Sequence, residues 1–223
     1  MSSHFIDVET IAHPHLAEWL SAADIKPAGN LKDPLKIAAD IAEKLQKRQD
    51  EAALDGKLNR IVCWGERHDT GDDFTVILLD EDDERDCLTR FWRRYDTALD
   101  TYVGFNLLSF DVNVIIMRSW LLGVTPSITE VSQYRDRSGR FIDLRAMLSQ
   151  GDKFAHGSLS WWCTRFGIQV ADPTTGGDVA AMWAAQDYQG IVAHCQADLL
   201  RTDALYGRLH RPAVRPEASD DLV

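Results

Sequence analysis

Short apolar runs separate longer segments in which apolar residues recur at helical spacing. Residues 5–8 are apolar and partly β-branched, which predicts a strand that carries Asp7 and ends near Glu9. A similar run at 102–105 predicts another strand. The acidic pair therefore lies at the end of the first predicted strand.

Two neighbouring apolar runs predict a hairpin. Residues 61–64 and 74–79 each have the length and composition of a strand. Residues 68–73 between them are rich in Asp, Gly and Thr, which are typical of turns.

Helical periodicity dominates the rest of the chain. Apolar positions three and four apart predict helices within 88–99 and 110–121, and a long last helix within 188–205. A strand, a hairpin, a helix, a strand and then helices describe an α/β domain with a mixed sheet flanked by helices.

The region 12–60 differs from its surroundings because prolines and glycines interrupt it. A helix is predicted to begin at Asp33-Pro34 and to carry an apolar face. We interpret this region as a loop and helix insertion after the first strand, flanking the active site, because a long connection in a compact domain is usually functional. Residues 1–210 are then one domain, and 211–223 are a flexible C-terminal tail.

Composition excludes several classes of protein. The net charge of −11 disfavours a protein that coats duplex DNA, since such proteins neutralise many phosphates. The four cysteines form no Cys-x-x-Cys pair, which disfavours a zinc knuckle or a disulfide framework. No secretion signal and no membrane-spanning run is found, so a cytoplasmic location without membrane contact is expected. The acidic run 80–86 is interpreted as a solvated turn leading into a helix.

Three segments carry candidate chemistry. Asp7 and Glu9 are two apart on a strand, so both side chains leave the same face, where like charges are costly unless cations lie between them. Asp111 follows a Gly-x-Asn segment at the start of a helix. His194 and Asp198 are four apart on the last helix and so share a face.

Each segment alone is weak, but their order resembles the three exonuclease motifs of the DEDD superfamily. The nearest resemblance is to stand-alone exonucleases related to the proofreading domain of family B DNA polymerases, in which the last Asp precedes a Leu-rich stretch with Thr and Tyr, as in 198–206 here. The resemblance covers about residues 4–209 and implies a ribonuclease H-like fold.

The resemblance also implies two divalent metal ions, Mg²⁺ or Mn²⁺, held by Asp7, Glu9, Asp111 and Asp198. By analogy, Asp7 bridges both ions, Glu9 and Asp198 complete the site beside the attacking water, and Asp111 supports the other ion. Independently, phosphodiester hydrolysis needs an activated water and a stabilised leaving oxygen, and two metals supply both. Mg²⁺ prefers oxygen ligands, which carboxylates provide.

One residue departs from the pattern of the superfamily. Its branches have either Tyr four residues before the last Asp or His five before it, whereas His194 stands four before Asp198. A role as general base, or in orienting the water, is expected for His194, with its exact part left open.

Three further residues are candidates for substrate binding. Thr10 follows the acidic pair, Phe105 could stack on a terminal base, and Asn106 resembles the Asn that faces the substrate strand in relatives. A turn-stabilising Asn106 and a core Phe105 are the alternatives. Asp143 is expected to be structural or to support the metal ligands.

These features predict a 3′→5′ exonuclease that releases nucleoside monophosphates from single-stranded 3′ ends, with DNA favoured over RNA. The alternatives are a nucleic-acid-binding module that has lost catalysis, an exoribonuclease, and a structure-specific endonuclease. A polymerase or repair partner would have to act in trans, and the sequence leaves the oligomeric state open.

Overall fold

The computed structural model describes residues 2–69, 74–131, 139–152 and 156–210. Its sheet has five strands in the order β3-β2-β1-β4-β5. The strands are β1 (Ser3–Ala12), β2 (Asn59–His68), β3 (Phe74–Leu78), β4 (Thr101–Gly104) and β5 (Phe141–Asp143). The predicted tail 211–223 and most of the predicted turn 68–73 lie outside the described residues.

The sheet is mixed, as predicted. β1 is central, antiparallel to β2 and parallel to β4, while β3 extends the antiparallel side and β5 the parallel side. β1 does not end near Glu9, as the apolar run predicted, but continues to Ala12 because it stays paired with β2 beyond a register shift at Glu9/Thr10. A β-bulge of this kind re-aims neighbouring side chains and is common beside active sites.

The described residues contain eight α-helices. They are α1 (Leu16–Trp19), α2 (Pro34–Asp50), α3 (Glu81–Thr97), α4 (Asp111–Leu121), α5 (Leu144–Ser149), α6 (Leu159–Arg165), α7 (Val179–Ala184) and α8 (Tyr188–His210). Short 3₁₀ turns are η1 (Ala22–Asp24), η2 (Ala52–Leu54) and η3 (Gly176–Asp178). No helix among the described residues is long and apolar enough to cross a membrane.

Two hydrophobic layers hold the helices to the sheet. α3 and α4 cover one face, where Ile6 and Val8 of β1 pack against residues such as Leu88 and Ile115. α5, α6, α7 and α8 cover the other face, where Phe5 belongs to the same buried cluster as residues of all four helices. Because successive side chains of a strand point to opposite faces, β1 contributes to both layers.

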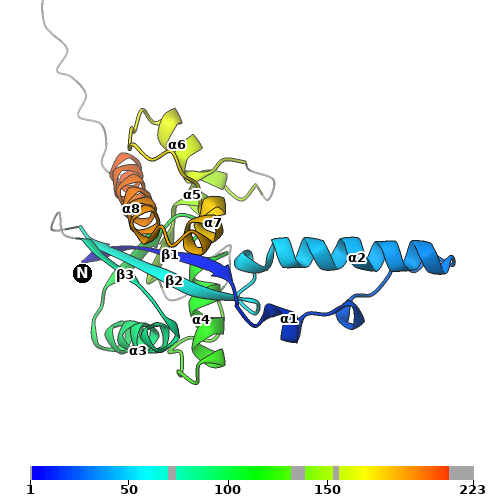
Figure 1. Ribbon diagram of the computed structural model, residues 1–223. Helices are drawn as coiled ribbons and strands as arrows, with labels where there is room; N and C mark the ends of the chain where they lie inside the picture. Colours follow the sequence, from blue (N-terminus) through cyan, green and yellow to red (C-terminus); the bar gives the residue numbers. More distant parts are fainter. Residues whose placement is uncertain (1, 70–73, 132–138, 153–155, 211–223) are drawn as a thin grey trace, which may run out of the picture.

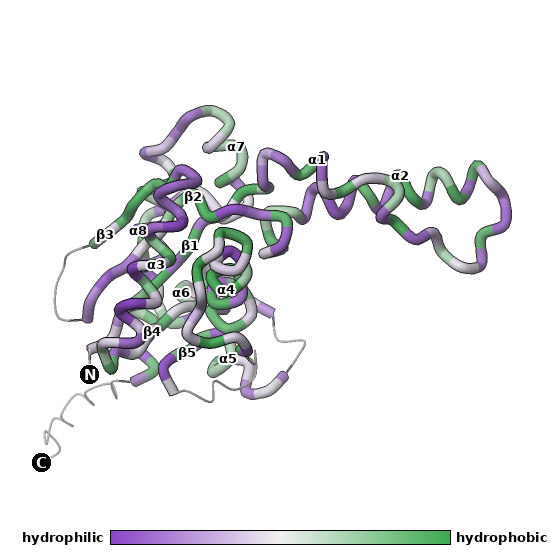
Figure 2. The backbone as a smooth tube through the Cα atoms, turned by 90° about the horizontal axis from the view of Figure 1, so that it is seen from below, coloured by the Kyte–Doolittle hydropathy of each residue, from purple (hydrophilic) through white to green (hydrophobic). Residues whose placement is uncertain are grey.

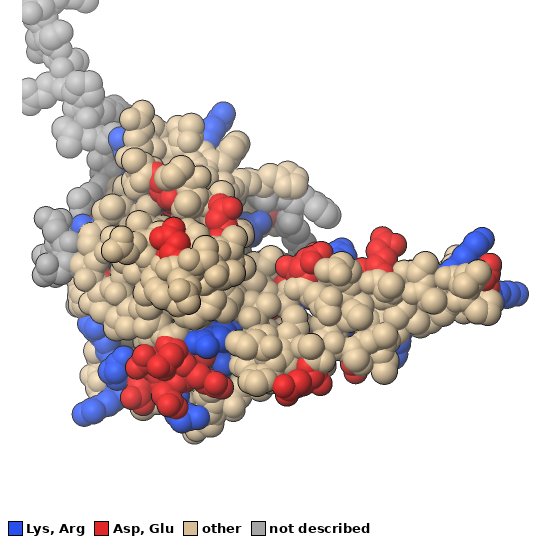
Figure 3. Space-filling model, viewed as in Figure 1, with Lys and Arg blue, Asp and Glu red and all other residues tan. Residues whose placement is uncertain are grey.

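The acidic run 80–86 is the beginning of α3. The side chain of Asp80 caps the helix by accepting from the Asp83 amide at 2.9 Å. Acidic side chains gather on the surface over α3 (Figure 3), where the positive end of the helix dipole favours them. Glu84 is the exception to the predicted solvated turn, since it is fully buried and binds Arg118 through two hydrogen bonds.

The region 12–60 forms an arm that projects from the body of the molecule (Figures 1 and 2). The predicted helix is α2, which Asp33 caps and Pro34 begins, but none of its residues is buried. Leu35 is 82% exposed, whereas Ile41 and Leu45 pack against a small cluster that includes Leu20. The apolar face of α2 therefore packs only through Ile41 and Leu45, toward the end of the helix that lies nearer the body of the molecule.

Candidate active site

The four predicted carboxylates lie on three elements, which are β1, α4 and α8. Asp7 and Glu9 lie on β1, and their oxygens and the Cys195 sulfur of α8 are all within 4.8 Å of one another. Asp111 is the first residue of α4, and its Oδ1 accepts from the Val8 amide at 3.2 Å. Asp198 lies on α8, close enough to raise the pKa values of both Asp7 and Glu9.

Burial and mutual repulsion disfavour ionisation of Asp7, Glu9 and Asp111. Burial, followed by the charge of Asp198, raises the pKa of Asp7 from 3.8 to about 7. Burial and the nearby Asp7 raise the pKa values of Glu9 and Asp111 well above their usual range. Acids in such surroundings ionise together only when cations compensate their charge.

The donor set fits divalent metal ions. Oδ2 of Asp7 is buried and has no hydrogen-bond partner in the described part of the chain. A buried carboxylate oxygen without a donor is costly, and a hard cation satisfies it. The residues that could hold such ions are Asp7, Glu9, Asp111 and Asp198, and only oxygens are needed from them.

His194 lies buried on α8 at the edge of this cluster. Its Nδ1 is 2.8 Å from Oδ2 of Asp172 and 3.1 Å from the Thr174 hydroxyl. Its Nε2 is 3.7 Å from Oε1 of Glu9. The ring therefore spans from Asp172 on one side to Glu9 on the other.

Two residues of this network were missed by the sequence reasoning. Arg201 donates through Nη1 to Asp172 at 2.9 Å and to Asp198 at 2.6 Å. Burial opposes ionisation of Asp172, yet hydrogen bonds from Thr174 and His194 lower its pKa to about 2. The spacing of Arg201, three residues after Asp198 on one helix, was a signal that could have indicated the first contact.

The three candidates for substrate binding follow the acidic pair or precede Asp111 in the chain, and each also makes contacts within the protein. The Thr10 hydroxyl donates to the Ala53 carbonyl of η2 at 2.6 Å. Phe105 is partly buried against the cluster beneath α8. Asn106 adopts a positive φ of 65° in the β4–α4 loop, and its Oδ1 accepts from Arg145 at 2.8 Å.

Asp143 organises the loop that leads to Asp111. Its carboxylate accepts from the amides of Asn106 at 2.9 Å and Leu108 at 3.0 Å, and it also caps α5. It belongs to β5, a strand of three residues that the apolar pattern did not predict. Asp143 thus makes structural contacts, and its charge also contributes to the raised pKa of Asp111, so its contacts are consistent with both interpretations made from the sequence.

Comparison with known proteins supports an exonuclease-like chain. The model of a family described as "Predicted 3′-5′ exonuclease related to the exonuclease domain of PolB" matches residues 54–217. The matched segment includes Asp111, His194 and Asp198, and it begins after β1. The assignment of Asp7 and Glu9 to the site is therefore supported by the geometry above and not by this match. No curated protein matches.

Among solved structures, the chain is similar to the family B DNA polymerase from the hyperthermophilic archaeon Pyrobaculum calidifontis. The TM-score is 0.61 at 15% sequence identity, over 93% of this chain and 24% of the polymerase chain. The chain thus spans about a quarter of that polymerase's length. This likeness concerns the fold and confirms the predicted α/β, ribonuclease H-like architecture.

Proposed function

The chain belongs to the family of predicted 3′–5′ exonucleases related to the exonuclease domain of PolB, and on this premise we propose that it is a metal-dependent 3′→5′ exonuclease acting on single-stranded nucleic-acid ends. The observation that carries the proposal is that Asp7 and Glu9 lie together on β1, with Asp111 bonded to the Val8 amide between them and Asp198 close enough to raise the pKa of Asp7. The raised pKa values of Asp7, Glu9 and Asp111 are those of a site built to receive cations.

In the proposed mechanism, the four carboxylates hold two divalent ions, Mg²⁺ or Mn²⁺. When bound, two such ions clamp the attacking and leaving oxygens and stabilise the charge that develops on phosphate. Asp7 is electrostatically linked to both Asp198 and Asp111, since the charge of Asp198 raises its pKa and it in turn raises the pKa of Asp111. Asp7 would therefore be one of the residues that hold the metal.

His194 is proposed to take the proton from the attacking water. Because Asp172 is ionised, it accepts a hydrogen from Nδ1 of His194, so Nε2 carries the lone pair. That nitrogen is the one nearest Glu9 and thus faces the carboxylate cluster. Asp172 acts as a positioning residue that fixes both the ring orientation and its tautomer.

The proposed substrate is the 3′ end of a single strand, with DNA favoured and nucleoside monophosphates as products. The structural neighbour is a DNA polymerase, and the net charge of −11 disfavours tight binding along a duplex. Phe105, Thr10 and the Asn106 loop are the proposed contacts for the terminal nucleotide. A fold that binds strands without cleaving them, or one that prefers RNA, is the alternative.

A labelled oligonucleotide tests this function. With Mg²⁺ or Mn²⁺, a 5′-labelled strand should shorten in a ladder, while a 3′-labelled strand should lose its label at once as a mononucleotide. Chelation of the metal should stop both reactions. Strands of the same sequence in DNA and RNA compare the two substrates directly. A discrete internal product would indicate an endonuclease, and retention without cleavage would indicate a binding module.

We also propose that residues 1–210 form one exonuclease domain in which 12–60 is an insertion flanking the active site. The hydrogen bond from Thr10 to Ala53 supports this proposal, because Thr10 directly follows Glu9 and Ala53 lies near the end of the arm. The family match begins only at residue 54, after almost all of the arm.

Shortening the arm should impair substrate handling more than folding. In this variant a short Gly-Ser linker replaces residues 26–40, keeping Leu20, Ile41 and Leu45 at the base. Because no residue of α2 is buried, the free energy of unfolding should change by no more than about 1 kcal/mol. The melting temperature should then change by only a few degrees. The Michaelis constant for long oligonucleotides should rise severalfold. Aggregated protein would show instead that the outer arm is needed for folding.

A further inference from the structure

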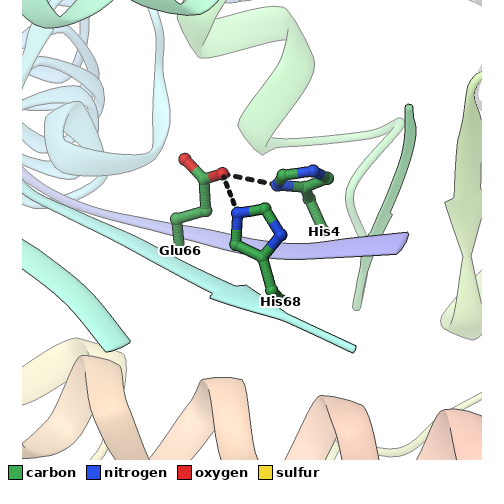
Figure 4. Close-up of side chains that lie close together, drawn as sticks. All are labelled: His4, Glu66 and His68. Atoms are coloured by element: carbon green, nitrogen blue, oxygen red, sulfur yellow. Dashed lines mark hydrogen bonds and ion pairs between the residues drawn. The ribbon is translucent and has the colours of Figure 1, made fainter. Parts of the chain in front are cut away.

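A second group of metal-binding side chains lies away from the carboxylate site, near the start of β1. His4 of β1 is paired in register with His68 of β2, and Glu66 precedes His68 on the same face (Figure 4). Ligand atoms of these three residues all lie within 4.8 Å of one another. Asp100, just before β4, adds an oxygen 3.2 Å from Nε2 of His4.

All four groups converge on the guanidinium of Arg94 from α3. Its Nη2 is 2.7 Å from Nε2 of His4 and 3.3 Å from Nε2 of His68. Its Nη1 donates to Glu66 at 2.9 Å, and its Nε donates to Asp100 at 3.2 Å. Two imidazole nitrogens and two carboxylate oxygens therefore already surround one cation.

The charges around the guanidinium suit a cation of higher charge. Two carboxylates, those of Glu66 and Asp100, face this single guanidinium.

The cluster is accessible to solvent, and part of it is preorganised for binding. Arg94 has 37% of its side chain exposed, and together with Glu66 and His68 it lines a pocket of about 260 Å³. His4, by contrast, is fully buried and fixed. Glu66 lies 2.5 Å from Nδ1 of His4, which orients the ring so that Nε2 points at the guanidinium. Hydrogen bonding of a ligand's other ring nitrogen is typical of metal sites.

We propose that His4, His68, Glu66 and Asp100 form a binding site for one divalent transition-metal ion of the Zn²⁺ or Co²⁺ class, which enters by displacing the guanidinium of Arg94. Imidazole nitrogens select such ions over Mg²⁺, which prefers oxygen. Two nitrogen and two oxygen donors match the coordination number of four that Zn²⁺ adopts in structural sites. The bound ion would fasten β1 to β2 on the face opposite α8.

Co²⁺ binding followed by equilibrium dialysis and visible absorption tests the site. The background is Asp7→Asn/Glu9→Gln, which disables the carboxylate site. This protein should retain one equivalent of Co²⁺, with its melting temperature raised. His68→Gln should lose that equivalent, and His15→Gln should keep it, since His15 is another partly exposed histidine paired with a carboxylate. Arg94→Gln removes the competing cation and should tighten binding by about tenfold or more.

Three results would overturn the proposal. The first is that the double variant binds no Co²⁺. The second is that His68→Gln binds as much as His15→Gln. The third is that Arg94→Gln binds no more tightly, which would mean that the cluster is only an ion-pair network around Arg94. Circular dichroism checks that each variant is folded. Because none of these measurements follows cleavage, the outcome of this experiment is independent of the exonuclease assay.

Discussion

Asp7→Asn is expected to reduce 3′-end degradation by about 10³-fold or more while the protein stays folded. The substitution keeps the shape of the side chain but removes the charge at the centre of the carboxylate cluster, where Asp7 faces Asp198 and Asp111. Losing a carboxylate ligand from this cluster should weaken metal binding and so the hydrolysis that the metal would support. Rates on a 5′-labelled oligonucleotide at saturating Mg²⁺ or Mn²⁺ measure the effect.

The same substitution should stabilise the protein when metal is absent. The pKa of Asp7 is about 7 in the folded chain, against the ordinary value of 3.8 expected in the unfolded chain, so the folded chain holds the proton more tightly. The contribution of this tighter proton binding to the free energy of unfolding is therefore fully present below about pH 4, and it is lost as the pH rises to about 7 and above. Asn cannot ionise, so Asp7→Asn should be more stable at about pH 8 by on the order of 1–3 kcal/mol.

Thermal unfolding in a chelator at about pH 5 and pH 8 measures this second effect. Asp50→Asn is the matched control, because Asp50 is an exposed acid at the end of α2, away from the cluster. It should alter neither the rate nor the pH dependence of stability. Degradation at a near wild-type rate by Asp7→Asn would show that the proposed metal assignment is wrong.

The central part of the sheet was predictable because local pattern and tertiary packing agree there. The apolar run 5–8 forms the middle of β1, and its alternate residues enter the two hydrophobic layers. The end of β1 was not predictable, since pairing with β2 across a bulge extends the strand over residues whose own pattern is mixed. β5 has only three residues, too few for a periodicity to indicate it.

The site was predictable to the extent that its members share an element. Two-residue spacing brings Asp7 next to Glu9, and four-residue spacing brings His194 next to Asp198. Asp172 was missed because it stands in a loop 22 residues before His194, and only the packing of that loop against α8 brings the two together. A loop acid carries no periodic signal that would separate it from solvated ones.

His194→Ala is expected to reduce the cleavage rate by about 10²-fold with metal binding largely kept, because a base contributes on this scale and the carboxylates remain. His194→Tyr should restore part of the rate, since a tyrosine hydroxyl can still orient the attacking water.

Asp172→Asn completes the test of His194, because an amide can offer Nδ1 a hydrogen where the carboxylate only accepts one. The wrong tautomer would then carry its hydrogen on Nε2, which faces Glu9. The rate should fall by about tenfold or more, and the double variant with His194→Ala should be no slower than His194→Ala alone, because the two residues act as a unit. Asp178→Asn is the control, because Asp178 is an exposed acid at the end of η3, six residues after Asp172. Additive losses in the double variant would show that Asp172 supports the loop and Arg201 rather than the imidazole.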